Sequence, residues 1–168
     1  MADPTVEVTT NHGSFVIALD PAKAPVSVEN FLRYVDAKHY DGTVFHRVIP
    51  TFMIQGGGFD QELEKRSVQA PIQNEATNGL KNTRGTVAMA RTGEPHSATA
   101  QFFVNVTDNA PLDHKATSTE GWGYAVFGRV TSGMDVVDKI KGVPTGASGP
   151  FSKDAPQTPV VIQSVRRS

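Results

Sequence analysis

The sequence contains no cysteine and only one tryptophan among its 168 residues. Without cysteine, the chain has neither a disulfide framework nor a thiolate metal site, and a thiol nucleophile is excluded. An excess of one charge is also missing, because 16 Lys and Arg residues stand against 17 Asp and Glu residues, for a net charge of -1. A chain so close to neutrality has no general attraction to nucleic acid, so we expect no nucleic-acid partner.

Long apolar runs are absent as well. No stretch approaches the roughly 20 apolar residues that span a bilayer, so we expect no membrane partner. The first residues, Met1 to Val8, show no basic segment followed by an apolar one, which a secretory signal would require. We therefore expect a cytoplasmic protein. The content of 38% hydrophobic and 20% charged residues is typical of a folded domain, and we expect residues 1–168 to form a single one.

The chain does contain many short segments with the periodicity of secondary structure. Apolar residues alternate over 5–10 and 14–20 around a turn at Asn11-His12-Gly13, which predicts a β-hairpin. Apolar residues at i, i+3, i+4 and i+7 predict a helix over about 25–38. A second helix is predicted over about 133–141, with a capping box formed by Ser132 and Asp135 at its start.

Further strands are predicted at 86–89, 101–106, 124–130 and near 160–165, whereas 67–84 and 142–159 read as loops. Many short strands with two helices and no β-α-β alternation predict a mainly β protein, with a closed or nearly closed antiparallel sheet capped by helices. Large side chains at many inward-facing positions argue against a barrel that stores a small ligand.

The familiar types of catalytic site find little support. Gly56-Gly57-Gly58 is not followed by Gly-Lys-Ser/Thr, so a tight backbone bend explains it better than a phosphate-binding loop. No serine lies in a Gly-x-Ser-x-Gly elbow. The five histidines form no His-x-x-x-His pair, and we expect neither a metal nor a cofactor; they are His12, His39, His46, His96 and His114.

One residue remains unexplained by these site types. Arg47 lies in an apolar, strand-like run that begins at Phe45, passes through Pro50 and ends in the three glycines at 56–58. A guanidinium in such surroundings either extends past its neighbours to water or points into a pocket. Residue types alone leave both possibilities open, and core packing explains many of the large apolar side chains nearby.

The run FHRVIPTFMIQGG at 45–57 resembles the signature of the cyclophilins, which are peptidyl-prolyl cis/trans isomerases. Other motifs resemble the family in the same order, and together they cover essentially the whole chain. The resemblance implies a closed eight-stranded antiparallel barrel with a helix at each end, and an isomerase that assists protein folding. The additional motifs are Val28-Glu29-Asn30-Phe31, residues 85–90, Gln101-Phe102-Phe103, Leu112-Asp113, residues 126–130 and residues 133–137.

The resemblance also implies roles for individual residues. Arg47 is similar to the catalytic arginine, Gln55 to the glutamine that helps hold it, and Phe52 joins them in the catalytic group. The pocket for the proline ring is matched by Phe52, Met53, Phe103 and Leu112. Contacts to the substrate backbone or to a flanking residue are matched by His46, Ala90, Gln101 and, through its main chain, Arg91. Tyr124 stands beside the proline pocket, where the best-known eukaryotic members carry a histidine.

Three residues in or beside the predicted site depart from a simple strand pattern or from the eukaryotic members of the family. Strand alternation places Met53 and Gln55 on one face and Phe52 on the other, so a shared site requires a bulge or a strong twist. Pro111 replaces a tryptophan of the eukaryotic members and, like Tyr124, is more similar to the bacterial branch. Loss of the indole implies weak cyclosporin binding with activity retained.

The expected partners are proline-containing peptides and flexible protein segments, and we expect a monomer. The main alternative is a non-catalytic chaperone or adaptor that captures proline-containing segments in the same groove.

Overall fold

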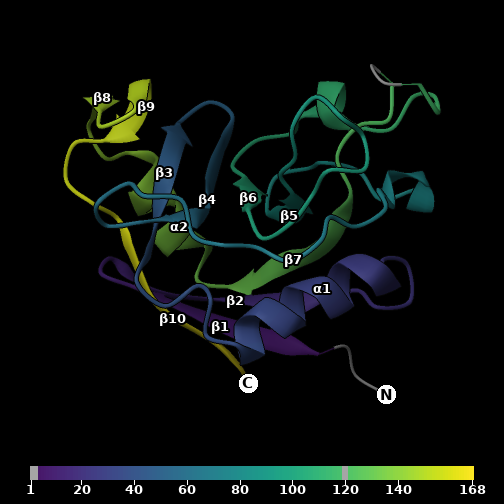
Figure 1. Cartoon of the computed structure of the whole chain (residues 1–168), viewed down its shortest axis with the longest axis horizontal. Helices are drawn as coiled ribbons and strands as arrows, with labels where there is room; N and C mark the ends of the chain where they lie inside the picture. The colour runs from purple at the N-terminus through teal and green to yellow at the C-terminus, as the bar shows by residue number, and fades with distance from the viewer. Residues whose placement is uncertain (1–3, 119–120) are drawn as a thin grey trace.

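Eight antiparallel strands close into a barrel in the order β1-β10-β3-β4-β6-β5-β7-β2 (Figure 1). The structure is a computed structural model, and it describes residues 4–118 and 121–168. The prediction of a mainly β protein with a closed eight-stranded barrel and two α-helices is confirmed. The barrel strands are β1 (Thr5–Thr10), β2 (Gly13–Leu19), β3 (Thr43–Ile49), β4 (Met53–Asp60), β5 (Thr86–Met89), β6 (Phe102–Asn105), β7 (Val126–Ser132) and β10 (Val161–Arg167).

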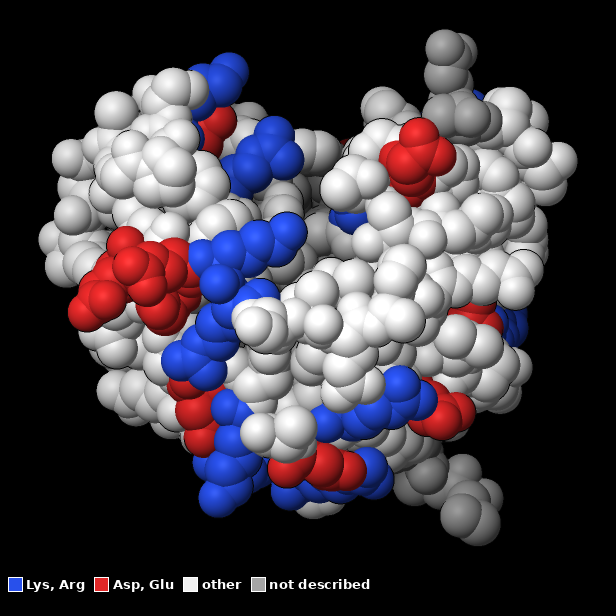
Figure 2. All heavy atoms as spheres, viewed as in Figure 1, with Lys and Arg blue, Asp and Glu red and all other residues white. Residues whose placement is uncertain are grey.

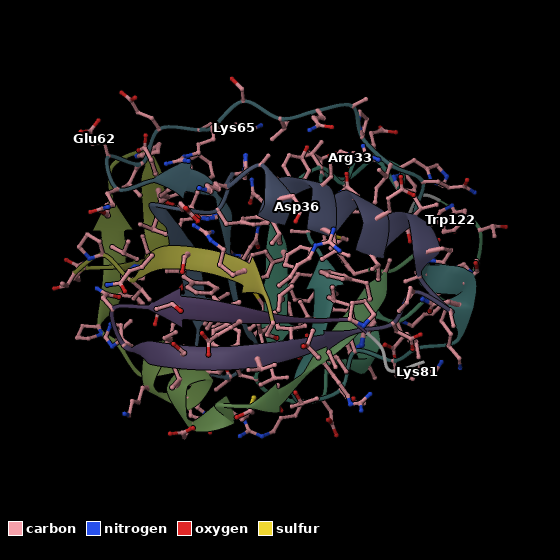
Figure 3. All side chains as sticks on the ribbon, turned by 90° about the horizontal axis from the view of Figure 1, so that it is seen from below. Arg33, Asp36, Glu62, Lys65, Lys81 and Trp122 are labelled. Atoms are coloured by element: carbon pink, nitrogen blue, oxygen red, sulfur yellow. The ribbon has the colours of Figure 1, made fainter. Side chains whose placement is uncertain are left out.

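Helix α1 (Pro25–Asp36) forms where the apolar periodicity predicts it and ends two residues earlier. Pro25 occupies the first turn, where its missing N–H costs no hydrogen bond. Apolar side chains on one face of the helix are buried, whereas Arg33 and Asp36 lie on its outer side (Figure 3). No helix within the described residues is long and apolar enough to cross a bilayer.

Helix α2 (Met134–Lys141) also lies where it is predicted, but the capping box is wrong. Its N-cap is Gly133, with φ +84°, and no side chain caps the helix. A Cβ at Gly133 would lie 2.5 Å from the carbonyl oxygen of Ser14 and 2.7 Å from Cα of Phe15. Close approach to β2 therefore requires glycine at this position, and the backbone conformation of glycine replaces the predicted hydroxyl cap.

The interior of the barrel is filled with large side chains. Fully buried aromatic rings pack against one another here, as in the edge-to-face contact of Phe31 and Phe102 at 5.5 Å. This packing agrees with the argument against a ligand-storing barrel. The segment 67–84 is mainly loop, as predicted, with a short 3₁₀ helix η1 (Ala76–Asn78), and a second one, η2 (Ala110–Leu112), precedes Asp113.

A hairpin of β8 (Thr145–Ser148) and β9 (Phe151–Pro156) lies outside the barrel, where the sequence predicted only loop. Its small and polar residues lack the alternation of a half-buried strand, and its attachment is tertiary. Phe151 packs on His46 of β3 at 5.2 Å and on Phe59 of β4 at 5.1 Å between ring centroids.

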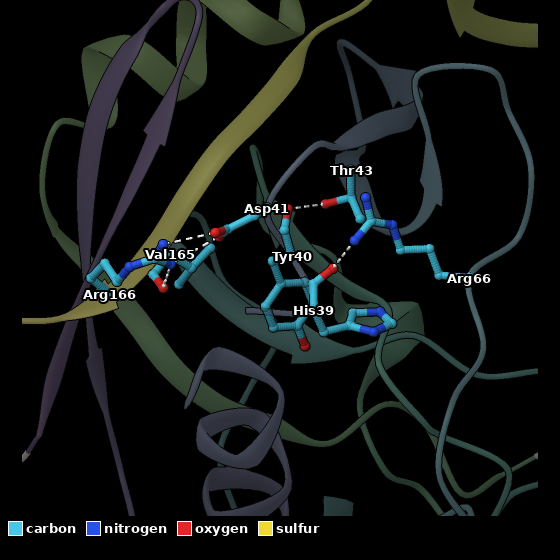
Figure 4. Close-up of polar contacts among 7 residues, drawn as sticks. All are labelled: His39, Tyr40, Asp41, Thr43, Arg66, Val165 and Arg166. Atoms are coloured by element: carbon cyan, nitrogen blue, oxygen red, sulfur yellow. Dashed lines mark hydrogen bonds and ion pairs between the residues drawn. The ribbon is translucent and has the colours of Figure 1, made fainter. Parts of the chain in front are cut away.

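The turn that leads from α1 into β3 is held from several sides (Figure 4). Arg66 donates to the carbonyl oxygen of His39 at 3.0 Å, and the Thr43 hydroxyl donates to that of Tyr40 at 2.6 Å. Arg166 of β10 forms a bidentate ion pair with Asp41, with N–O distances of 2.8 and 2.7 Å. These contacts fix the point at which β3, the strand that carries Arg47, enters the barrel.

Candidate active site

A pocket lies on the outer face of β3, β4 and β6. Along β4, Ile54 points into the barrel core, so its neighbours Met53 and Gln55 point outward. Gln55 pairs with Arg47 of β3 on one side and with Phe103 of β6 on the other. The strand register alone therefore places these four side chains next to one another on the outside of the barrel.

We call this site the outer pocket. It has a volume of about 130 Å³. That is the space of about four water molecules at about 30 Å³ each, and it is well below the ~300–1,000 Å³ of drug-sized pockets. A pocket of this volume can hold one small ring. The hollow at the upper edge of Figure 2 lies between the ends of β3 and β4 and the loops beyond β5 and β6. The lining residues are Arg47, Phe52, Met53, Gln55, Ala90, Arg91, Phe103, Leu112 and Tyr124.

Phe52 reaches the outer pocket because it is not part of a strand. Residues 50–52 form the turn between β3 and β4, closed by a hydrogen bond from the Phe52 N–H to the Ile49 carbonyl at 2.9 Å. Strand β4 begins only at Met53. The conflict of faces, for which a bulge or a strong twist was expected, is thus resolved at Phe52 by a turn.

A bulge does occur on the opposite strand, β3. Phe45 pairs with Gly56 and Arg47 with Gln55, so His46 is an extra residue on β3. Phe45 remains in the barrel core, whereas Arg47 is exposed at the rim of the outer pocket. The bulge thus changes the direction of β3 just before Arg47, so that its guanidinium can reach the outer pocket.

Gln55 faces Arg47 across the strands, but its side chain is bonded elsewhere. Its Nε2 donates to Oε1 of Gln101 at 2.9 Å. Among residues 4–118 and 121–168, no hydrogen bond joins the side chains of Gln55 and Arg47. Gln101 does not line the outer pocket and reaches it through this contact with Gln55. That Gln55 holds Arg47 remains a prediction.

His46 also lies apart from the outer pocket. It is 5% exposed, and its ring packs against both Phe59, at 4.6 Å, and Phe151, at 5.2 Å. Burial and the neighbouring charge of Arg47 lower the pKa of His46 to about 4, so the ring is neutral near pH 7. Its predicted contact with the substrate backbone or a flanking residue stays a prediction. The aromatic cluster attaches the β8–β9 hairpin to the strand that carries Arg47.

Arg91 and Tyr124 form one wall of the outer pocket. The Arg91 guanidinium lies 4.5 Å from the centre of the Tyr124 ring, which is a cation–π contact. Its Nε and Nη2 donate to the carbonyl oxygen of Gly123 at 3.1 and 2.9 Å. The side chain of Arg91 is thereby occupied with structural contacts, which is consistent with the main-chain role that the resemblance implies.

The glycine triplet allows close packing behind Gln55. At Gly57, with φ +92°, a Cβ would lie 2.7 Å from Cε1 of Tyr40. At Gly58 a Cβ would lie 2.5 Å from Cγ of Gln101. A Cβ at either position would come too close to its neighbour, so both positions require glycine. This agrees with the prediction that the triplet forms a tight backbone bend.

Sequence reasoning missed the polar groups that lie beneath the outer pocket. The buried side chains of Asn82, Asn105 and Asn109 bond to one another and to backbone carbonyls of residues that line it. One signal was present in the sequence: Asn105 interrupts an otherwise apolar strand, and a buried amide requires partners.

The barrel has counterparts among solved cyclophilins. A crystal structure of a cyclophilin-type isomerase from Cryptosporidium parvum matches with a TM-score of 0.78, covering 98% of this chain and 97% of that chain. At 24% identity, this match shows the fold alone. The model of the family described as cyclophilin type peptidyl-prolyl cis-trans isomerase matches residues 5–167, and this chain belongs to that family.

Bacterial relatives are much more similar in sequence. A peptidyl-prolyl cis-trans isomerase of Streptomyces antibioticus is 62% identical over 162 residues, covering 96% of this chain and 97% of the relative. Peptidyl-prolyl cis-trans isomerase B of Escherichia coli is 58% identical over 156 residues, covering 93% and 94%. The predicted family, enzyme class and bacterial branch are thereby confirmed.

Proposed function

We propose that the outer pocket binds the ring of a proline residue and that Arg47 accelerates rotation about the preceding peptide bond by donating to the prolyl nitrogen. The observation that carries this proposal is the position of Arg47 at the rim of a small hollow lined by Phe52, Met53 and Phe103. Apolar side chains bind the ring, and an exposed guanidinium beside them can approach the bond.

The chemistry requires no bond to break. Resonance within the peptide unit raises a barrier of ~18–20 kcal/mol to rotation. Before proline, the two isomers are nearly equal in energy but exchange over tens to hundreds of seconds. As the bond twists, the prolyl nitrogen regains its lone pair and becomes a hydrogen-bond acceptor. A donor that meets it only in the twisted state lowers the barrier rather than merely tightening binding.

Arginine suits this role because its guanidinium is planar, always charged and rich in donors. Gln55, opposite Arg47 in the strand register, is placed to position it once substrate is bound. The apolar walls exclude water, and an electrostatic contact is stronger in such surroundings. Burying the ring against Phe52 and Leu112 would hold proline while the residue before it rotates.

The test is the exchange rate of a short X-Pro peptide, measured by NMR exchange spectroscopy with wild type and with Arg47→Ala. Loss of one donor that acts only in the transition state should lower kcat/KM by about 10²–10³-fold. Arg47→Lys should recover part of the rate, because it keeps the charge and loses the forked geometry. Equal rates for wild type and Arg47→Ala would refute the proposal.

Arg129→Ala is the matched control. Arg129 is an exposed arginine on the outer face of β7, and it lines a neighbouring hollow but not the outer pocket. Its removal should leave the rate unchanged. Peptide binding by Arg47→Ala without catalysis would separate this enzyme from the adaptor alternative, in which binding alone is the function.

The cyclophilin fold binds proline-containing peptides, and the Cryptosporidium parvum protein was also crystallised in the presence of the dipeptide Ala-Pro. For this chain we further propose flexible X-Pro segments as substrates in protein folding, weak cyclosporin binding because of Pro111 and Tyr124, and a monomeric, cytoplasmic, single-domain protein. Titration with cyclosporin, sedimentation and cell fractionation test these points. Tight inhibition by cyclosporin would contradict the second of them.

A further inference from the structure

Three buried asparagine side chains, which we call the asparagine chain, run in series beneath the outer pocket. Asn109 donates through Nδ2 to Oδ1 of Asn105 at 2.8 Å, and Asn105 donates through Nδ2 to Oδ1 of Asn82 at 3.1 Å. The second Nδ2 hydrogen of Asn105 has an acceptor in the hydroxyl of Thr86, 2.9 Å away. The amide of Asn105 is thus fully bonded, although the residue is 0% exposed.

The outer pocket has two kinds of wall. Residues such as Met53 and Phe103 lie in strands, and the hydrogen-bond ladder of the barrel fixes their backbone. Phe52, Leu112 and Tyr124 lie outside strands, in the β3–β4 turn, in η2 and in the loop before β7. Backbone bonds hold them in part, because the Phe52 carbonyl accepts from the N–H of Val106, just beyond β6, at 3.2 Å, and side-chain contacts hold them as well.

The asparagine chain adds side-chain donors to these backbone bonds. Asn109 Nδ2 donates to the carbonyl oxygen of Phe52 at 2.9 Å. Asn82 Nδ2 lies 3.2 Å from the carbonyl oxygen of Leu112 and 3.3 Å from that of Tyr124, and Oδ1 of Asp113, at 3.2 Å, shares its two hydrogens with them. The two ends of the asparagine chain therefore reach the backbone of three of the five lining residues that lie outside the strands, the other two being Ala90 and Arg91.

Asn105 connects the two ends. It pairs with Met53 in the register of β6 and β4, at the back of the outer pocket, and does not itself line the pocket. A branched apolar residue would suit a buried strand position without the cost of desolvating an amide. An amide, however, can accept from Asn109 and donate to both Asn82 and Thr86 at the same time, which a hydroxyl with its single donor cannot do.

We propose that Asn105 is a positioning residue for the isomerase, and that it sets the width of the proline-binding pocket by orienting Asn82 and Asn109. The inference rests on the proposed function for its kinetic consequence. The walls concerned hold the proline ring in the cis, trans and twisted states alike. Their displacement therefore weakens binding of every state, and the loss appears in KM rather than in kcat.

The experiment compares wild type, Asn105→Ala and Val8→Ala under conditions in which all three are folded by circular dichroism. Val8 is a fully buried residue of β1, so its truncation destabilises the barrel core without touching the outer pocket. We expect kcat/KM of Asn105→Ala to fall about ten- to a hundredfold, mainly through a higher KM. Val8→Ala should stay within about twofold of wild type, because distant sites act independently.

Hydrogen exchange provides a readout that does not depend on activity. The N–H of Leu112 donates to the Asn109 carbonyl at 2.9 Å, and the N–H of Tyr124 donates to the Leu112 carbonyl at 2.8 Å. Both amides should exchange faster in Asn105→Ala than in Val8→Ala. Should Asn105→Ala fail to fold, Asn109→Ala provides the same comparison, because it removes the donor to Phe52 at a position nearer the surface.

The outcomes separate the two proposals. An inactive wild type refutes the proposed function, and local exchange at Leu112 and Tyr124 still decides the role of Asn105. An active wild type, with Asn105→Ala matching Val8→Ala in both KM and local exchange, overturns this inference. A fall in kcat at constant KM also overturns it, because pocket width would then not be the quantity that Asn105 controls.

Discussion

The buried imidazole of His46 should make the protein lose stability as the pH falls from about 6.5 to about 4. Burial against Phe59 and Phe151, and the adjacent charge of Arg47, lower its pKa from 6.5 to about 4. Between these two values the unfolded chain binds a proton that the folded chain does not. Protonation therefore favours unfolding, and the stability present above pH 6.5 is lost progressively below it.

The magnitude follows from the pKa values. A fall from 6.5 to about 4 corresponds to a total of about 3 kcal/mol in the free energy of unfolding, because each pKa unit is worth about 1.4 kcal/mol. Between pH 7 and pH 5 the loss should be about 2 kcal/mol. The carboxylates of Asp36, Asp41 and Asp138 have pKa values below the ordinary 3.8 and contribute only at lower pH. His39, whose pKa burial also lowers, adds a change of the same sign.

Urea unfolding at pH 7, 6 and 5 with wild type and His46→Phe isolates the contribution of His46, because His39 and the carboxylates are common to both proteins. Phenylalanine keeps the contact with Phe151, and a hollow of about 50 Å³ beside His46 leaves room for the larger ring. The variant should have the flatter stability curve. Parallel curves for the two proteins would show that His46 is not held neutral by its surroundings.

Three further changes test the packing around the site. Gly58→Ala should displace Gln101, because the new Cβ would lie 2.5 Å from its Cγ, and kcat/KM should fall about tenfold as Gln55 loses its partner. Tyr40→Phe removes the hydroxyl that donates to the Ala100 carbonyl at 2.7 Å, and the resulting unpaired carbonyl should lower the free energy of unfolding by about 1–3 kcal/mol in urea titrations. Glu75→Ala removes the carboxylate that accepts from two N–H groups in the first turn of α1, at a cost of about 1 kcal/mol that salt should not abolish if the hydrogen bonds dominate.

Periodicity identified most of the elements because their burial repeats regularly along the chain. Strand β5 (Thr86–Met89) forms at the predicted residues, and α1 and α2 differ from prediction by at most two residues. The β8–β9 hairpin was missed for the converse reason. It is held to the barrel through Phe151, and one contact of this kind leaves no repeating pattern in the sequence.

At the site, the prediction was correct for side chains whose direction follows from their position along a strand. Met53 and Gln55 share a face of β4 because alternate side chains of a strand must do so. The resemblance implies that His46 contacts the substrate backbone or a flanking residue, and this stays a prediction; the pattern could not show the bulge and the aromatic contacts around its ring. Although His46 is next to Arg47 in the sequence, its ring therefore does not line the outer pocket.

Phe52 shows how a residue that lies outside the strands comes to line the outer pocket. A strict strand pattern would point its ring away from Met53, yet a three-residue turn brings both to one hollow. The carbonyl of Phe52 accepts from the Val106 N–H at 3.2 Å and from the side chain of Asn109, which is 57 positions away in the chain. Contacts at that separation leave no local signal. The conflict of faces was nevertheless informative, because a residue that belongs to a site but violates strand alternation has to be held there by something other than the sheet.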